Sequence, residues 1–210
     1  STGGAINSEA LLVVPGKPTV FTGDPEISLQ IMGFFSGKYN YSENFPHLYL
    51  YMNNRALSLA DINSFSNNSC LLQGNSYIFE SSIIGNLTDH SQLIDMPYLQ
   101  KCLGCLNLES TDEFLAKSLL SIKQINPNFQ VFSKRLMITR ALYLKLSPVL
   151  VYGWLDDLNS EEISSIISVC SENNQILIAY SRKESVISKF SSNISTSQLY
   201  DLGLVSRSDL

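Results

Sequence analysis

Two adjacent carboxylates, Asp156 and Asp157, are the first residues whose position could support chemistry. They closely follow the apolar run Val149–Tyr152, which is typical of a parallel strand buried on both faces. Ligands of open α/β sheets bind beyond the carboxyl ends of such strands, where carboxylates can hold a divalent cation. The positions directly after this run are Gly153 and Trp154, and neither side chain binds a cation or accepts a proton. We therefore interpret the two aspartates as loop or dimer-contact residues and assign no catalytic residue.

A second candidate is the pair Cys102 and Cys105, which has the Cys-x-x-Cys spacing of zinc and redox sites. A zinc site needs about two further ligands, and Cys70 and Cys170 are distant single residues without a nearby histidine. The apolar spacing around the pair favours one buried face of a helix. We predict no metal site, and four scattered cysteines favour a reducing compartment.

Composition and charge limit the class of protein. With 44% hydrophobic and 16% charged residues, the 210-residue chain is globular but charge-poor. A net charge of −5 argues against a nucleic-acid partner, because phosphates call for a basic surface. No apolar run approaches the roughly 20 residues that span a bilayer, and Ser1–Gly4 does not begin a signal peptide. We expect residues 1–8 to be an expression remnant or disordered.

The surrounding pattern predicts alternating strands and helices, and hence an α/β fold with a mostly parallel sheet. Thr19–Thr22 is a strand, and a helix with a crowded apolar surface ends at Ser147-Pro148, because proline lacks an amide donor. A second amphipathic helix, capped at Ser160, leads to a buried strand at Ile176–Ala179. Residues 89–129 have the spacing of a small helical unit.

The most specific pattern lies at Ser69–Thr88, where a strand ends at Gln73, a loop carries an aromatic residue, and Ile-x-x-Asn-Leu opens a helix. This stretch resembles the Q-loop of exporter-type ABC transporters. Arg140–Leu142 and Ser147-Pro148 then follow in the order found in the nucleotide-binding domain of that family. The resemblance extends over Leu11–Leu202 by the order and spacing of elements.

The resemblance implies a P-loop NTPase-like, mostly parallel sheet with an inserted helical subdomain. Residues 1–79 and 148–210 would form the RecA-like core, and residues 80–147 the helical subdomain. Gln73 matches the family glutamine that touches the metal and the attacking water. Three residues match the surface that receives the coupling helix of the transmembrane domain, namely Tyr77, Phe79 and Ile83.

The phosphate loop departs from the family pattern. The loop after Gly23 is about five residues short, and it contains two acids and a proline before Ser28. Negative charge and a missing amide donor would repel a phosphate group that the loop should bind. Gly23, Ser28 and Gln73 are therefore interpreted as vestigial nucleotide-binding residues.

Four further functional positions differ as well. The Walker B aspartate and glutamate correspond to Gly153 and Trp154, and the switch histidine corresponds to Tyr180, with Arg182 close by. The signature region, near Asn128–Phe132, has no glycine to permit close backbone approach. Because phosphoryl transfer depends on positioning and charge stabilisation by these parts, the resemblance implies a fold without the catalytic machinery.

These departures imply a degenerate, non-catalytic nucleotide-binding domain, a pseudo-ATPase at the cytoplasmic face of the membrane. Its partners would be the transmembrane domain of an ABC exporter and a second nucleotide-binding domain, identical or different, and no nucleic acid. No cofactor is expected, although the family would allow ATP and Mg²⁺. Two alternatives remain: an active ATPase with displaced residues such as Lys38 and Asp157, and an unrelated α/β binding module without a separate helical lobe at Glu80–Ser147.

Overall fold

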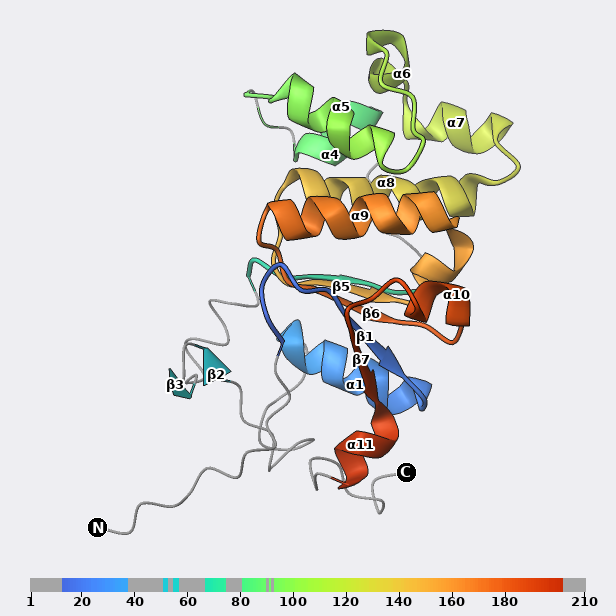
Figure 1. Cartoon of the computed structure of the whole chain (residues 1–210). Coiled ribbons are helices and arrows are strands. Elements are labelled where there is room, and N and C mark those ends of the chain that lie inside the picture. The colour runs from blue at the N-terminus through green and yellow to red at the C-terminus, as the bar shows by residue number, and fades with distance from the viewer. Residues whose placement is uncertain are drawn as a thin grey trace.

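A computed structural model describes residues 13–37, 51–52, 55–56, 67–74, 81–89, 91 and 93–201. Within these ranges the main sheet has five strands, all parallel, in the order β4-β5-β6-β1-β7 (Figure 1). The strands are β1 (Thr19–Thr22), β4 (Cys70–Leu72), β5 (Val149–Tyr152), β6 (Leu177–Tyr180) and β7 (Ser192–Ser195). The parallel sheet confirms the predicted α/β fold class. A separate antiparallel ribbon pairs β2 (Tyr51–Met52) with β3 (Arg55–Ala56).

Helices cover both faces of the sheet (Figure 1). α8 (Phe129–Tyr143) and α9 (Ser160–Glu172) lie on one face, and α1 (Pro25–Phe35) lies on the other. Strand side chains alternate between the two faces because successive residues point to opposite sides. The strand residues packed in the cluster with α8 and α9 are Val20, Leu72, Val149, Val151, Leu177 and Ala179. Those packed in the cluster with α1 are Phe21, Leu150, Ile178, Tyr180 and Ile194.

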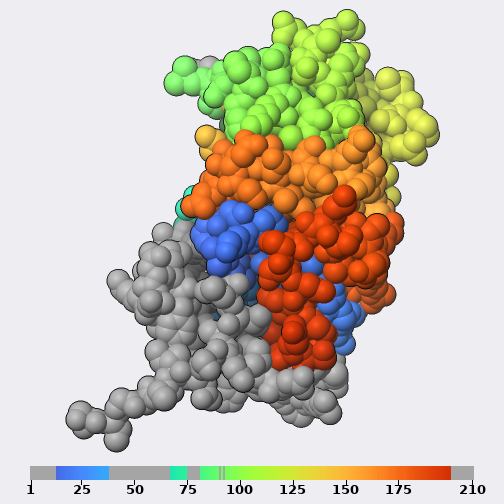
Figure 2. Space-filling view, viewed as in Figure 1, coloured from blue at the N-terminus to red at the C-terminus, as the bar shows by residue number. Residues whose placement is uncertain are grey.

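Four short helices form a helical lobe that lies over α8 and α9 (Figures 1 and 2). The lobe consists of α4 (Ile83–Thr88), α5 (Met96–Gly104), α6 (Asp112–Ala116) and α7 (Leu119–Ile125). A separate apolar cluster joins it to α8, and its fully buried members are Ile83, Leu87, Leu99, Leu103 and Leu136. An α/β module without helices in this part of the chain is therefore excluded. The finer division into residues 1–79 with 148–210, and 80–147, stays a prediction.

The structure corrects several element boundaries. The cap of α9 is Asn159 rather than Ser160, because the Asn159 side chain accepts from the amides of Glu161 and Glu162. α8 ends at Tyr143, before the expected Ser147-Pro148, because the chain turns through a left-handed residue at Lys145. β7 has no counterpart in the sequence prediction, since three of its four residues are polar. Lys38 and residues 1–8 lie outside the described residues.

The remaining elements are short. η1 (Trp154–Asp157), α10 (Glu184–Ile187) and α11 (Thr196–Asp201) follow β5, β6 and β7, respectively. Among the residues that the structure describes, no helix combines the length and the apolar character that a membrane crossing requires.

Candidate functional site

The carboxyl ends of β1, β5 and β6 meet at one edge of the sheet, where α/β proteins bind their ligands. Tyr152 and Tyr180, the last residues of β5 and β6, stack there with ring centroids 4.8 Å apart and an interplanar angle of 13°. The Tyr152 hydroxyl donates to the carbonyl oxygen of Pro25 at 3.0 Å, and the Tyr180 hydroxyl donates to that of Gly23 at 3.2 Å. This tyrosine stack therefore ties β5 and β6 to the loop after β1.

The hydroxyl of Tyr180 has further contacts. Arg182 donates to it from Nε at 2.8 Å, so the oxygen accepts one hydrogen bond while it donates another to Gly23. Tyr180 is 4% exposed, and burial raises the pKa of the neighbouring Tyr152. Both hydroxyls thus serve as fixed donors to the backbone. The arrangement has no group that could exchange a proton at neutral pH as an imidazole does.

The loop after β1 uses its own carboxylate to satisfy the start of α1. Asp24 is the N-cap, and its Oδ1 accepts from the amides of Glu26 at 2.8 Å and Ile27 at 3.2 Å. The amide of Asp24 donates to Thr196 Oγ1 at 2.8 Å, and Ser28 Oγ donates to the carbonyl oxygen of Asp24 at 2.7 Å. Helix amides of this kind are what binds an anion in a phosphate loop. Here the anion they bind is a side chain of the protein itself.

Gly23 is held in a conformation that favours glycine. Its φ is +95°, and a Cβ atom at this position would lie 2.3 Å from Thr196 Oγ1. Together with the Asp24–Thr196 hydrogen bond, this close approach fixes the loop against the junction of β7 and α11. Gly23 lies in the loop after β1, and Ser28 lies near the start of α1, where it is fully buried.

The end of β5 holds an indole where the resemblance places a catalytic glutamate. Gly153 has φ +72° and begins the 3₁₀ turn η1, which directs Trp154 into the core, where it is 3% exposed. The ammonium of Lys134 lies 6.0 Å from the centroid of the Trp154 ring, a cation–π contact from α8. Gly153 thus turns the chain after β5, and Trp154 packs in the core.

The aspartates of η1 are both bound by neighbouring side chains. Asp157 forms an ion pair with Lys134 of α8. The Asp156 carboxylate accepts from the hydroxyl of Ser181, and its backbone carbonyl accepts from the ammonium of Lys183. Among the described residues, no group of three histidine, cysteine or acidic side chains could hold a metal ion. Asp157 thus links η1 to α8, and Asp156 links η1 to the segment after β6.

The predicted transmembrane-docking residues divide into two groups. Tyr77 and Phe79 lie outside the described residues. Ile83 is fully buried at the start of α4, in the cluster between the helical lobe and α8, so its side chain cannot meet a partner and this assignment is wrong. Gln73 follows β4 directly and is half-buried, beside β5 in the sheet.

Sequence reasoning missed three residues that shape the site: Tyr152, Asp24 as a cap, and Thr196. Tyr152 was assigned only to the apolar strand, although a polar hydroxyl at a strand's carboxyl end signals a contact beyond the sheet. Asp24 directly before Pro25 is a recognisable start of a helix, since aspartate caps and proline favours the first turn. Thr196 carried no local signal, because its contact joins parts of the chain that are 172 positions apart.

The cysteines lie away from this edge of the sheet. Cys102 of α5, Cys105 at the end of α5 and Cys170 of α9 are buried in one apolar cluster. Burial raises the pKa of the thiol to about 11 for Cys102 and about 12 for Cys170, and it also raises the pKa of Cys105. Neutral thiols are poor nucleophiles. The interpretation of Cys-x-x-Cys as an apolar helical pair is therefore confirmed by its burial.

Taken together, these side chains do not fit MgATP, the ligand that the resemblance would allow. The amides at the start of α1 already bind the Asp24 carboxylate, and the tyrosine stack bonds the carbonyl groups of Gly23 and Pro25. Gly153 and Trp154, which directly follow β5, carry no carboxylate. A triphosphate would meet negative charge and buried hydroxyls where it needs free donors.

No family model matches this sequence, and no curated protein matches it. Solved structures do match. The chain is similar to an ABC transporter ATP-binding protein from Pyrococcus furiosus, with a TM-score of 0.64 and 15% identity, over 89% of this chain and 87% of that one. The fold is that of an ABC ATP-binding cassette.

Two further structures share the cassette fold. A bacterial Atm1-family ABC exporter with ATP bound matches with a TM-score of 0.65 and 11% identity, over 87% of this chain but 32% of the exporter chain. A dimeric bacterial ABC transporter cassette matches with a TM-score of 0.61 and 13% identity, over 88% of this chain and 83% of that one. The matches to the Pyrococcus protein and to the dimeric cassette therefore each cover more than four-fifths of both chains.

Proposed function

We propose that this chain is a non-catalytic nucleotide-binding domain of an ABC exporter, a pseudo-ATPase that acts as a structural or regulatory partner in ATP-driven transport. The main support for this proposal is the tyrosine stack. Its hydroxyls donate hydrogen bonds to the carbonyl oxygens of Gly23 and Pro25, at the place where a phosphate loop would bind phosphate. Asp24 supports the same conclusion, because its carboxylate takes the amides at the start of α1.

The absence of a catalytic route follows from the donor set. Hydrolysis needs a cation held near the phosphates and a group that orients the attacking water. Gly153 and Trp154 supply neither, and the Tyr180 hydroxyl is already bonded to Gly23 and Arg182. No single substitution at these positions would restore the missing charges, because each residue also contributes to packing or to a fixed loop.

We propose two kinds of protein partner. The first is the transmembrane domain of an exporter, contacted through the loop that carries Tyr77 and Phe79, and the second is another nucleotide-binding domain. A full exporter chain and a dimeric cassette among the similar structures support this assignment by fold. The chain would then act at the cytoplasmic face of a membrane, with residues 1–79 and 148–210 as the core and 80–147 as the helical subdomain.

The contacts of Asp157 weigh against an ATPase with displaced residues. Its carboxylate forms an ion pair with Lys134, whose ammonium also lies near the Trp154 ring. A general base needs a free lone pair within hydrogen-bond distance of the attacking water. Asp157 is instead part of the link between η1 and α8.

A calorimetric titration of the whole chain with MgATP tests the absence of a nucleotide site. We expect no binding heat and no rise in melting temperature up to millimolar MgATP, because no free amide cluster or metal-binding acid meets the phosphates. We also expect no ATP turnover above background, and no difference between the wild type and Asp157→Asn. Micromolar binding would overturn the proposed blockage of the site, and Mg²⁺-dependent turnover that Asp157→Asn abolishes would establish an enzyme.

The docking assignment has a separate test. Phe79→Asp should abolish co-purification with the transmembrane half of an ABC exporter, since a carboxylate in an apolar contact is not compensated. Ile125→Asp serves as the control, because Ile125 is an exposed apolar residue at the end of α7, and the start of that helix is the part that bonds Ser81. Equal association of both variants and the wild type would contradict docking through residues 77–79.

A further inference from the structure

A buried carboxylate lies where α9 meets the helical lobe, away from the tyrosine stack. Glu162 is 1% exposed, and its Oε1 lies 2.9 Å from Arg135 Nη2 on α8. The same oxygen accepts from Asn107 Nδ2, in the loop after α5, at 3.2 Å. Its Oε2 accepts from the backbone amide of Asn159 at 3.0 Å, which completes the cap of α9. One charge therefore joins α9, α8 and the α5–α6 loop.

These partners satisfy the carboxylate in only one arrangement of the three elements. A buried charge is tolerated when it is paired and hydrogen-bonded, and losing a partner leaves it uncompensated. Asn107 lies in the loop after α5 in a left-handed conformation with φ +52°. A shift of this loop relative to α9 would break the hydrogen bond between Asn107 and Glu162. Packed interfaces of this kind adopt discrete arrangements rather than deforming continuously.

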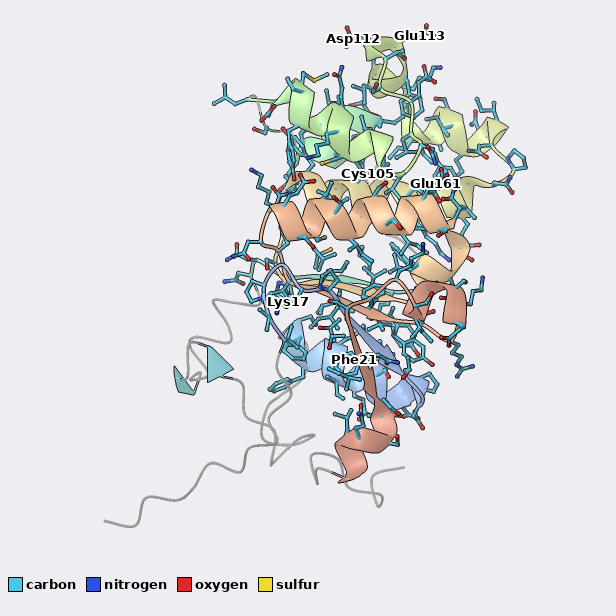
Figure 3. All side chains as sticks on the ribbon, in the orientation of Figure 1. Lys17, Phe21, Cys105, Asp112, Glu113 and Glu161 are labelled. Carbon is cyan, nitrogen blue, oxygen red and sulfur yellow. The ribbon has the colours of Figure 1, made fainter. Side chains whose placement is uncertain are left out.

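The rest of the interface between α5 and α9 supports the same arrangement. Asn173, the C-cap of α9, donates to the Tyr98 hydroxyl at 2.8 Å, and Lys101 forms an ion pair with Glu172. The buried thiols lie between these two contacts and the contacts of Glu162 at the other end of α9, and Figure 3 places Cys105 between the two helices. The helical lobe is thus attached to α9 by polar contacts at both ends of an apolar seam.

We propose that Glu162 is a positioning residue that fixes the helical lobe on the sheet core in one arrangement without any ligand. The contacts with Arg135, Asn107 and Asn159 set this arrangement. The inference goes beyond the proposed function and does not rest on it, because it concerns a joint distant from the tyrosine stack. A partner that binds the lobe would meet a surface already held in its final position.

Thiol labelling of the whole chain measures how often this joint opens. Cys102, Cys105 and Cys170 are buried between α5 and α9, and their raised thiol pKa keeps them unreactive until the interface separates. Each site is followed by mass spectrometry after exposure to an aromatic disulfide reagent at pH 8. Labelling at several low urea concentrations separates local opening from global unfolding, since local opening exposes less surface and depends less steeply on urea.

Glu162→Gln tests the charge while preserving the shape of the side chain and its capping bond, because glutamine also serves at this position of a capping box. We expect the labelling rates of all three cysteines to rise at least about tenfold, with a weak dependence on urea. Glu172→Gln is the matched control, since it removes the ion pair between Lys101 of α5 and Glu172 of α9. Both of these side chains are about half exposed. Its labelling rates should change less than about twofold.

A second variant keeps the test decisive if Glu162→Gln does not fold. Asn107→Gly removes the amide but suits the left-handed backbone, and it should raise the labelling of Cys102 and Cys105 about fivefold. The proposal is overturned if Glu162→Gln labels no faster than Glu172→Gln. It is also overturned if the rate rises only in step with the global unfolding constant, or if Asn107→Gly leaves the rates unchanged.

Discussion

Trp154→Glu is expected to destabilise the whole core rather than to create an ATPase. Trp154 is 3% exposed and packs in the cluster beneath α8 and α9. Truncating a buried tryptophan costs about 3–5 kcal/mol, and a carboxylate in the same place adds an unpaired buried charge. Lys134 would not compensate this charge, because its ammonium already pairs with Asp157. A typical domain has a total free energy of unfolding of about 5–15 kcal/mol. The Trp154→Glu variant should therefore be close to its unfolding midpoint at 25 °C.

Urea unfolding followed by far-ultraviolet circular dichroism measures this loss. Trp154→Phe serves as the control, since it keeps an aromatic ring in the cluster and should retain most of the stability. Asp157→Glu places the same glutamate at an exposed position of η1. Its urea midpoint should stay close to that of the wild type. A Trp154→Glu protein as stable as the wild type that also hydrolyses ATP would show that the Walker B position is open to catalysis.

Ile83→Asp should unfold the helical lobe. The Ile83 side chain is fully buried in the cluster that joins α4 to α8. Removing it to alanine costs about 2–5 kcal/mol, and an aspartate also buries a charge without a partner. Aspartate in the first turn of α4 would gain only about 0.3–1 kcal/mol from the helix dipole. The loss of packing is larger, so the variant is less stable than the wild type.

Hydrogen exchange of the α4, α5 and α8 amides should reveal this change as lost protection across the lobe. Leu93→Asp is the matched control, because Leu93 is 89% exposed in the loop between α4 and α5, and its substitution should change stability by less than about 0.5 kcal/mol. If Ile83→Asp kept full protection and lost only a membrane partner, Ile83 would be a docking residue after all.

Residues whose contacts are local were predictable from sequence. The buried strand Val149–Tyr152 was assigned from its run of apolar residues, and the helix at residues 160–172 from apolar residues spaced by three and four. Ile83 shows how a resemblance can mislead, because its spacing of four from Leu87 already indicated an apolar helix face. Ile83 was nevertheless assigned to the docking surface, because its position matched that surface in the family.

Residues whose contacts are distant in sequence could not be predicted in this way. The role of Tyr180 depends on a hydroxyl bond to Gly23 that spans 157 positions, and the role of Glu162 depends on partners 27 and 55 positions away. No pattern within a window of 10 to 20 residues encodes such pairings. Only the structure identified these contacts.

The position of β1 in the sheet has a consequence for biosynthesis. β1 pairs with β6 on one side and with β7 on the other, so its neighbours are made roughly 160 and 170 residues later. The nascent N-terminal part of the chain therefore cannot complete its share of the sheet until the last third has left the ribosome. During that interval its apolar strand is exposed to aggregation and to chaperones. A fragment that stops before Leu177 would leave β1 without either neighbour, so premature termination before this residue should prevent the core from forming.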